Sequence, residues 1–204
     1  TALPLFVWMG EILFRTKLSE NLFEGLAPWL QKLPGGLIHV NVVGCALFAA
    51  ISGSSAATVA TVGKMSIPEL RKRKYPEKIL LGSLAGSGTL GLLIPPSIIL
   101  IIYGVTVQES IAKLFIAGII PGIMIALIFM GYVIIWSLLN KNKMPLTEEN
   151  YSFLNKLSKS KQLIPVILLI LGVIGSIYTG IATATEAASL GVVGALILSY
   201  FQKS

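Results

Sequence analysis

ISGSSAATVA, residues 51–60, sets three serines and a threonine beside a glycine inside an apolar stretch that has no charged residue between Lys32 and Lys64. Gly53 lets the backbone leave helical geometry, and carbonyl groups freed in lipid then need a new partner. A bound cation is one such partner, and hydroxyl groups that serve helix packing alone are the alternative. The stretch therefore predicts the tip of a hairpin, with polar groups turned toward a ligand or a neighbouring helix.

The composition indicates an integral membrane protein. The chain is 54% hydrophobic and only 12% charged, about half the charged fraction of soluble domains. Its net charge of +7 comes from Lys and Arg grouped in short segments between apolar runs, which is the orientation signal of membrane proteins and not a nucleic-acid surface. No enzyme is expected, because the single histidine, His39, stands about 20 Å along a helix from Ser52.

The apolar runs divide the chain into six segments, and its start at Thr1 inside one of them suggests a piece of a longer protein. We expect an all-α integral membrane protein with a re-entrant helical hairpin and a discontinuous helix. The expected segments are a truncated membrane helix plus an amphipathic interfacial helix kinked near Pro28 (1–34), the re-entrant hairpin (35–63), a basic cytoplasmic loop (64–78), a discontinuous helix and the following transmembrane helix (79–139), a cytoplasmic linker (140–162), and two membrane helices (163–204).

The interfacial placement of residues 18–33 has an alternative, an ordinary amphipathic helix packed on a neighbour. The apolar run 163–178 is short for a span, since about 20 residues are needed to cross the hydrocarbon, unless it borrows from its flanks.

The distribution of Lys and Arg favours a hairpin over a crossing at 35–63. If this segment crosses the membrane, four of the 16 basic residues lie outside, namely Arg15, Lys17, Lys32 and Lys113. If it dips in and returns, only Lys113 does. The second arrangement agrees better with the positive-inside rule, although the first would also satisfy it.

Residues 79–104, ILLGSLAGSGTLGLLIPPSIILIIYG, predict a helix broken around Gly91–Pro96. Neither Pro95 nor Pro96 has an N–H to donate, and each ring clashes with the carbonyl four residues earlier. Two broken segments in succession indicate the coupling-ion and substrate site of a secondary transporter. Neutral carbonyl and hydroxyl oxygens suit Na⁺ better than a transition metal.

Three other features are expected to be structural. Asn41 is placed in an interhelical hydrogen bond more readily than at a ligand. Gly118 and Gly122, four residues apart, are read as helix packing. Glu186 is read as a helix-capping acid in preference to a proton site.

Five blocks, PLFVWMGE, LPGGLIHVNVV, ALFAAISGSSAATVATVG, GTLGLLIPPSIILIIYG and ATEAASLGVV, together resemble the large membrane subunit of tripartite ATP-independent periplasmic (TRAP) transporters. SGSSAAT and GTLGLLIPPS carry most of the resemblance, which covers about half of the usual length of the family. It implies half of an inverted-repeat, elevator-type carrier in the bacterial inner membrane. The carrier would be multi-pass and would work with a small membrane subunit and a periplasmic substrate-binding protein. Its substrate would be a carboxylate of the sialic acid or C4-dicarboxylate type, driven by Na⁺.

The resemblance also implies site residues. The Na⁺ site would be built by hairpin-tip serines and by carbonyls of the broken helix, at Ser52, Ser54, Gly91, Ile94 and Pro96. Substrate contacts are expected from the residues that flank this site, which are Ser54, Ser55, Pro95 and Ser97. A stand-alone ion-coupled anion carrier and a non-transporting membrane scaffold are the alternative functions.

Overall fold

The computed structural model describes residues 2–16, 18–145 and 152–201, and every regular element within them is a helix. In chain order these are α1 (Ala2–Phe14), α2 (Leu18–Leu30), α3 (Ile38–Ser52), α4 (Ser55–Lys72), α5 (Glu77–Gly88), the 3₁₀ helix η1 (Thr89–Leu92), α6 (Ile98–Thr106), α7 (Ile111–Leu139), η2 (Lys141–Lys143), α8 (Phe153–Ser160), η3 (Lys161–Leu163), α9 (Ile164–Tyr178) and α10 (Ala184–Phe201).

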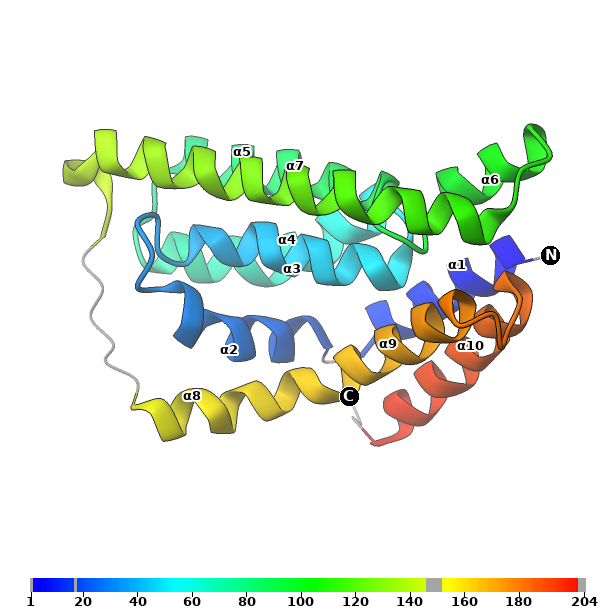
Figure 1. The fold of residues 1–204 in the computed structure, drawn as a ribbon. Helices are drawn as coiled ribbons and strands as arrows, with labels where there is room; N and C mark the ends of the chain where they lie inside the picture. The colour runs from blue at the N-terminus through cyan, green and yellow to red at the C-terminus, as the bar shows by residue number, and fades with distance from the viewer. Residues whose placement is uncertain (1, 17, 146–151, 202–204) are drawn as a thin grey trace.

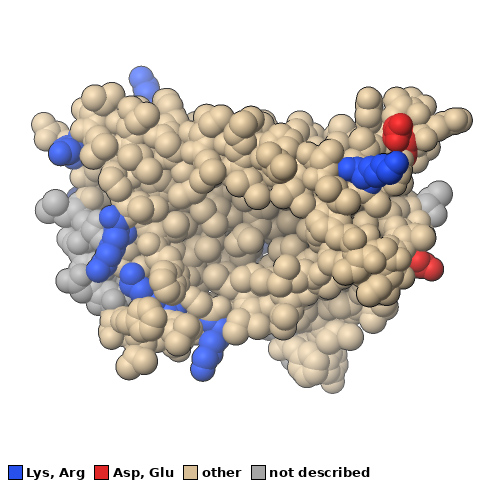
Figure 2. Space-filling model, in the orientation of Figure 1, with Lys and Arg blue, Asp and Glu red and all other residues tan. Residues whose placement is uncertain are grey.

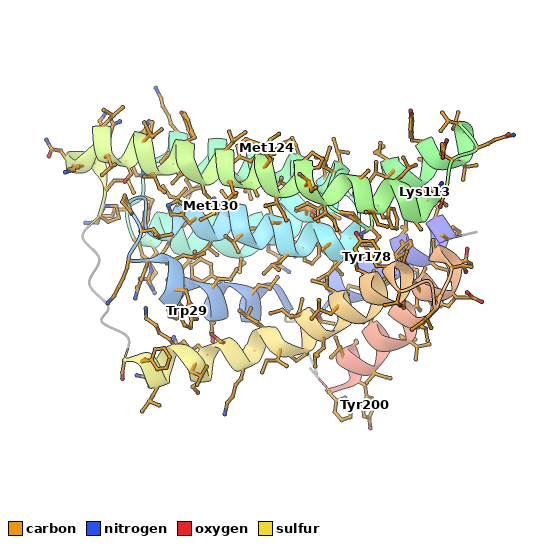
Figure 3. The ribbon with its side chains drawn as sticks, viewed as in Figure 1. Trp29, Lys113, Met124, Met130, Tyr178 and Tyr200 are labelled. Carbon is orange, nitrogen blue, oxygen red and sulfur yellow. The ribbon has the colours of Figure 1, made fainter. Side chains whose placement is uncertain are left out.

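The helices form two groups (Figure 1). The hairpin of α3 and α4 packs against α5, and α7 runs alongside α5. The second group contains α1, α9 and α10, which lie together at an angle to α7 (Figure 1). The groups meet where the rings of Phe6 and Phe115 cross edge to face, 6.2 Å apart, and where the Tyr178 hydroxyl donates to the Phe115 carbonyl at 3.3 Å (Figure 3).

Among the described residues, three helices are long and apolar enough to cross a membrane: Ile111–Leu139, Phe153–Tyr178 and Ala184–Phe201. The middle one joins α8, η3 and α9 into 26 residues, about 39 Å at 1.5 Å per residue. The short apolar run 163–178 therefore borrows its missing length from the segment expected as a linker, of which residues 146–151 lie outside the described part. The large apolar side chains exposed along α7, and the uncharged middle of the face in Figure 2, agree with a membrane protein.

The amphipathic segment after α1 is α2, and its apolar side packs inside the protein. Leu22, Phe23 and Leu26 are buried, and the helix contacts α3, α8 and η3. Gly25 allows the close approach to η3, because a Cβ atom there would stand 2.6 Å from the Leu163 side chain. The apolar side of α2 is thus covered by neighbouring helices, and its placement at the membrane interface stays a prediction.

The basic stretch 64–78 is mostly helix, because α4 continues through Pro68 to Lys72 and only residues 73–76 form the turn. Ser66 and Leu70, which are four residues apart and thus on the same side of the helix, are both buried in the core. At the turn, the backbone N–H of Leu37 donates to the Tyr75 hydroxyl at 3.1 Å. The start of α3 and the end of α4 therefore lie at the same end of the bundle, so the two helices form a true hairpin.

Candidate functional site

The turn between α3 and α4 contains a position, residue 53, that only glycine can occupy. Gly53 has φ +60°, a left-handed conformation that side chains rarely adopt, and a Cβ atom there would stand 2.6 Å from the Pro96 carbonyl oxygen. Ser54 is extended and caps α4, its Oγ accepting from the Ala57 N–H at 3.4 Å. The turn is therefore tight, and its backbone faces another part of the chain.

The part of the chain that the turn faces is the break between η1 and α6. The helix of α5 and η1 ends at Leu92, and α6 begins at Ile98, so the expected discontinuity is present. The peptide bond between Pro95 and Pro96 is cis. The Ser97 hydroxyl donates to the Leu92 carbonyl at 2.7 Å, across the break. A side chain thus satisfies one of the carbonyls at the end of the helix.

Tip and break are joined through their main chains. The Ile98 N–H donates to the Gly53 carbonyl at 3.1 Å. On the other side, a Cβ atom at Gly91 would stand 2.8 Å from the backbone nitrogen of Ser55. Two backbone segments that are far apart in sequence therefore touch, and a glycine on each of them makes the approach possible.

Buried hydroxyl groups line the tip. Ser52 is 2% exposed and Thr58 is 0% exposed, and their hydroxyl oxygens lie 2.9 Å apart. The Ser52 Oγ also donates to the Ser54 carbonyl and accepts from the Ser54 N–H, both at 3.3 Å. The Ser55 Oγ is buried and has no hydrogen-bond partner in the structure. Leaving a buried hydroxyl unpaired costs free energy, which distinguishes Ser55 from the paired hydroxyl groups of Ser52 and Thr58.

Four of the five residues expected at the Na⁺ site converge here. Ser52 and Ser54 form the tip, Gly91 contacts it, and the Pro96 carbonyl faces Gly53. The fifth, Ile94, belongs to the same break; its side chain packs against Gly122 of α7, and its carbonyl stays a predicted ligand.

The residues expected to contact substrate divide into two pairs. Ser54 and Ser55 are half-buried at the start of α4. Pro95 is buried against Gly118 of α7, and the hydroxyl of buried Ser97 is already bound to Leu92. The two serines thus belong to the tip, and Pro95 and Ser97 belong to the break that contacts it.

Two contributions were not foreseen from the sequence. Thr58 is the direct partner of Ser52, and only its spacing of four residues from Ser54 pointed toward the tip. Gly118 and Gly122 were read as helix packing, and they do pack, but they hold the break itself. A Cβ atom at Gly118 would stand 2.7 Å from the Leu93 carbonyl oxygen.

Asn41 and Glu186 have structural partners. The Asn41 Nδ2 donates to the Leu80 carbonyl at 3.2 Å and to the Ser83 Oγ at 3.0 Å, which confirms the interhelical bond. Glu186 accepts from both the N–H and the hydroxyl of Thr183 at 2.8 Å, while its own N–H donates to that hydroxyl at 3.3 Å. This reciprocal pair is a capping box, so capping is confirmed, with Thr183 as the cap residue.

Four helix ends meet around the tip and the break. α3 and η1 present their C-terminal ends, which carry partial negative charge, and α4 and α6 present their N-terminal ends, which carry partial positive charge. Among the described residues, no cluster of His, Cys, Asp or Glu large enough to hold a metal is found. The polar groups at the site are thus neutral oxygens and helix termini, which can bind a monovalent cation beside an anion.

The comparisons with known proteins agree over the whole chain. The model of the DctM component of tripartite ATP-independent periplasmic transporters matches residues 1–204. The chain is 35% identical over 200 residues to a C4-dicarboxylate TRAP transporter large permease protein of Pseudomonas aeruginosa, with 98% of this chain and 46% of that protein covered. It is 37% identical over 203 residues to an isethionate TRAP transporter permease protein of Oleidesulfovibrio alaskensis, with 98% and 31% covered.

A third relative, a sialic acid TRAP transporter permease protein of Haemophilus influenzae, is 35% identical over 201 residues, with 98% of this chain and 32% of that protein covered. The chain therefore spans half or less of the length of these relatives. A family match from the first residue to the last, together with the helical hairpin and the broken helix, establishes that the chain belongs to the DctM component family of TRAP transporters.

Proposed function

We propose that this chain is the Na⁺-binding half of a membrane subunit that imports a carboxylate by secondary transport. The observation that carries the proposal is the contact between the hairpin tip and the break, where the Gly53 carbonyl accepts from the Ile98 N–H. Broken helices that meet in this way are where secondary transporters bind their substrates and coupling ions.

The cation would lie among neutral oxygens at the tip. The hydroxyl groups of Ser52 and Ser54, with carbonyls of Gly91, Ile94 and Pro96, are the proposed ligands. The residues present suit an alkali cation, because the site offers hard uncharged oxygens and the C-terminal ends of α3 and η1. Thr58 would hold the Ser52 hydroxyl in position.

The anion would lie at the opposite helix ends. The N-terminus of α4, with the hydroxyls of Ser54 and Ser55, is the favoured contact, because it carries partial positive charge and one unpaired buried hydroxyl. Relatives named for C4-dicarboxylate and sialic acid support a carboxylate substrate. Pro95 and Ser97 would shape the break that the substrate faces.

The remainder of the transport cycle is proposed from the family. A periplasmic binding protein would deliver the substrate, a small membrane subunit would support this one in the bacterial inner membrane, and the hairpin would be re-entrant and move with α5–α7 in an elevator-like step.

The test is uptake by the full-length parent complex in proteoliposomes, with purified binding protein and varied Na⁺. We expect uptake to need Na⁺, and Ser52→Ala and Ser54→Ala to raise the half-saturating Na⁺ concentration about ten-fold each, equivalent to about 1.4 kcal/mol per ligand. Ser176→Ala is the matched control, because that hydroxyl bonds to its own helix at Val173.

Uptake that ignores Na⁺, or serine variants that match Ser176→Ala, would contradict the proposed ion site and favour a packing role for the hydroxyls. Uptake that proceeds without the binding protein would indicate a stand-alone ion-coupled carrier. No uptake by any correctly folded full-length complex would favour a non-transporting scaffold.

A further inference from the structure

A second surface, separate from the hairpin tip, forms where α8 lies beside α2 (Figure 3). The Trp29 Nε1 donates to the Ser160 Oγ at 2.7 Å, and the Trp29 ring meets Phe153 edge to face with centroids 6.4 Å apart. The Lys156 Nζ stands 5.4 Å from the Trp29 ring centroid. These contacts hold one side of α8 against α2. They therefore also determine which of its side chains point away from α2.

A neighbouring side of α8 is apolar and open. Phe153, Leu154 and Leu157 are 67%, 73% and 52% exposed. At 100° per residue they fall in one stripe, while Asn155 lies on the opposite side of the helix. The stripe continues the exposed apolar face of α9 in the same 26-residue helix. A surface of this kind is expected to face lipid rather than water.

The charged residues within α8 and η3 themselves are all lysines. From Ser152 to Leu163 the sequence has three lysines, at positions 156, 159 and 161, and no acidic residue. The carboxylate of Glu24, on α2, accepts from Gln162 at 3.2 Å. Lys and Arg side chains gather at the end of the face where α8 begins (Figure 2), the end that the positive-inside rule assigns to the cytoplasm.

We propose that α8 is a docking surface for anionic phospholipid headgroups of the cytoplasmic leaflet. Lys156, Lys159 and Lys161 attract the phosphate, and Phe153, Leu154 and Leu157 enter the boundary between headgroups and acyl chains. Trp29 anchors the helix at this level, as aromatic residues do at membrane interfaces. Charge complementarity favours an anionic lipid over a zwitterionic one, and the open apolar stripe favours a lipid surface over a soluble anion.

The first test measures lipid selectivity in the full-length complex, reconstituted in phosphatidylcholine nanodiscs with spin-labelled phosphatidylglycerol. We expect the motionally restricted fraction of the label to show a preference for phosphatidylglycerol that falls at least five-fold when Lys156, Lys159 and Lys161 are replaced by Gln. The control replaces Lys72, Lys74 and Lys78 by Gln, the same loss of charge at the same end of the bundle. Equal effects of the two triple variants, or no effect of the first, overturn the proposal.

The second test reports on depth. An environment-sensitive fluorophore on Leu157→Cys is expected to shift to the blue in phosphatidylglycerol-containing vesicles, while the same label on Asn155→Cys stays water-like. A shift at position 157 that requires the small membrane subunit and not the anionic lipid shows a protein contact, and it also overturns the proposal. Neither measurement depends on Na⁺ or on uptake, so its failure is separable from failure of the proposed transport function.

Discussion

At the scale of single residues, the direction of the Ser52 hydroxyl depends on Thr58. The two oxygens are 2.9 Å apart and both side chains are buried, so no water can replace Thr58 without space being made for it. We expect Thr58→Val, which keeps the shape and removes the hydroxyl, to raise the half-saturating Na⁺ concentration several-fold in the uptake assay, at unchanged maximal rate.

Thr58→Ser is the matched control for this prediction, because it keeps the hydroxyl and loses only a methyl group. If the Ser variant is as impaired as the Val variant, then packing at this position matters and the hydrogen bond does not.

Tyr75 gives the turn between α4 and α5 a dependence on alkaline pH. Burial raises the pKa of Tyr75 above its ordinary value of 10, against smaller opposing effects of the Leu37 N–H and the charge of Arg73. Because the folded state favours the neutral phenol, this stability is present below pH 10 and is lost as pH rises through the raised pKa. Tyr75→Phe should lower stability by about 1 kcal/mol at pH 8, by removing the bond to Leu37.

The melting temperatures of wild type and Tyr75→Phe, measured from pH 8 to pH 11, should therefore converge at the alkaline end. Tyr132→Phe, which removes a phenol at an exposed position on α7, is the control for the substitution itself. A constant difference between wild type and Tyr75→Phe would mean that burial of the Tyr75 phenol does not couple to folding.

At the scale of elements, the break between η1 and α6 packs against α7. Gly118 contacts the Leu93 carbonyl at a distance that leaves no space for a Cβ atom. Gly118→Ala should therefore push the break away from α7 and destabilise the protein by about 1–3 kcal/mol, as overpacking in a close-packed interior does. Thermal unfolding of the purified full-length protein measures the effect.

Gly131 provides the control within the same helix, since nothing lies within 4 Å of a Cβ atom built there. Gly131→Ala should leave the melting temperature unchanged or raise it, because alanine is the better helix former. Equal decreases in melting temperature for both variants would indicate that α7 tolerates no substitution, and would contradict a specific contact between Gly118 and the break.

The hairpin turn and the break could be predicted because both depend on local backbone chemistry. Gly53 supplies a left-handed residue, and Pro95 with Pro96 removes donors that a helix needs. The extent of α4 could not, because its charged residues suggested a loop, whereas the structure shows buried Ser66 and Leu70 carrying the helix to Lys72. Tertiary burial decided that boundary.

The sequence localises the tip and the break separately, and the structure shows that they touch, with Gly91 against the start of α4. The orientation of the side chains at this contact could not be predicted. The direction of Ile94 toward α7 follows from Gly122, which is far away in sequence. Such pairings depend on how helices stack, and a single sequence contains no direct signal of that stacking.

At the scale of the whole molecule, the arrangement of helices predicts which side each turn faces. The start of α3 and the turn after α4 lie together at one end of the hairpin, a few residues from Lys32 and Lys78 in sequence. Lys113 lies at the other end of the bundle (Figure 3). If α3 and α4 are re-entrant, a membrane-impermeant thiol reagent should label Lys113→Cys in intact cells. Lys32→Cys and Lys78→Cys should react only after permeabilisation.

Cys45 is buried and should not add background to this labelling. The informative position is 32, because a membrane-crossing segment at 35–63 would place it outside together with Lys113. Labelling of Lys32→Cys from outside would thus contradict the re-entrant arrangement, whatever the result at position 78.

The hydrogen bond from Ile98 to Gly53 uses main-chain atoms only. An alanine scan therefore does not remove this bond, since every alanine variant keeps the same backbone amide and carbonyl. Its contribution becomes measurable when the amide is replaced by an ester at position 98, or when Ile98→Pro removes the donor. Side chains around this contact can therefore change without removing the bond, provided that Gly53 and Gly91 still let the two backbones approach.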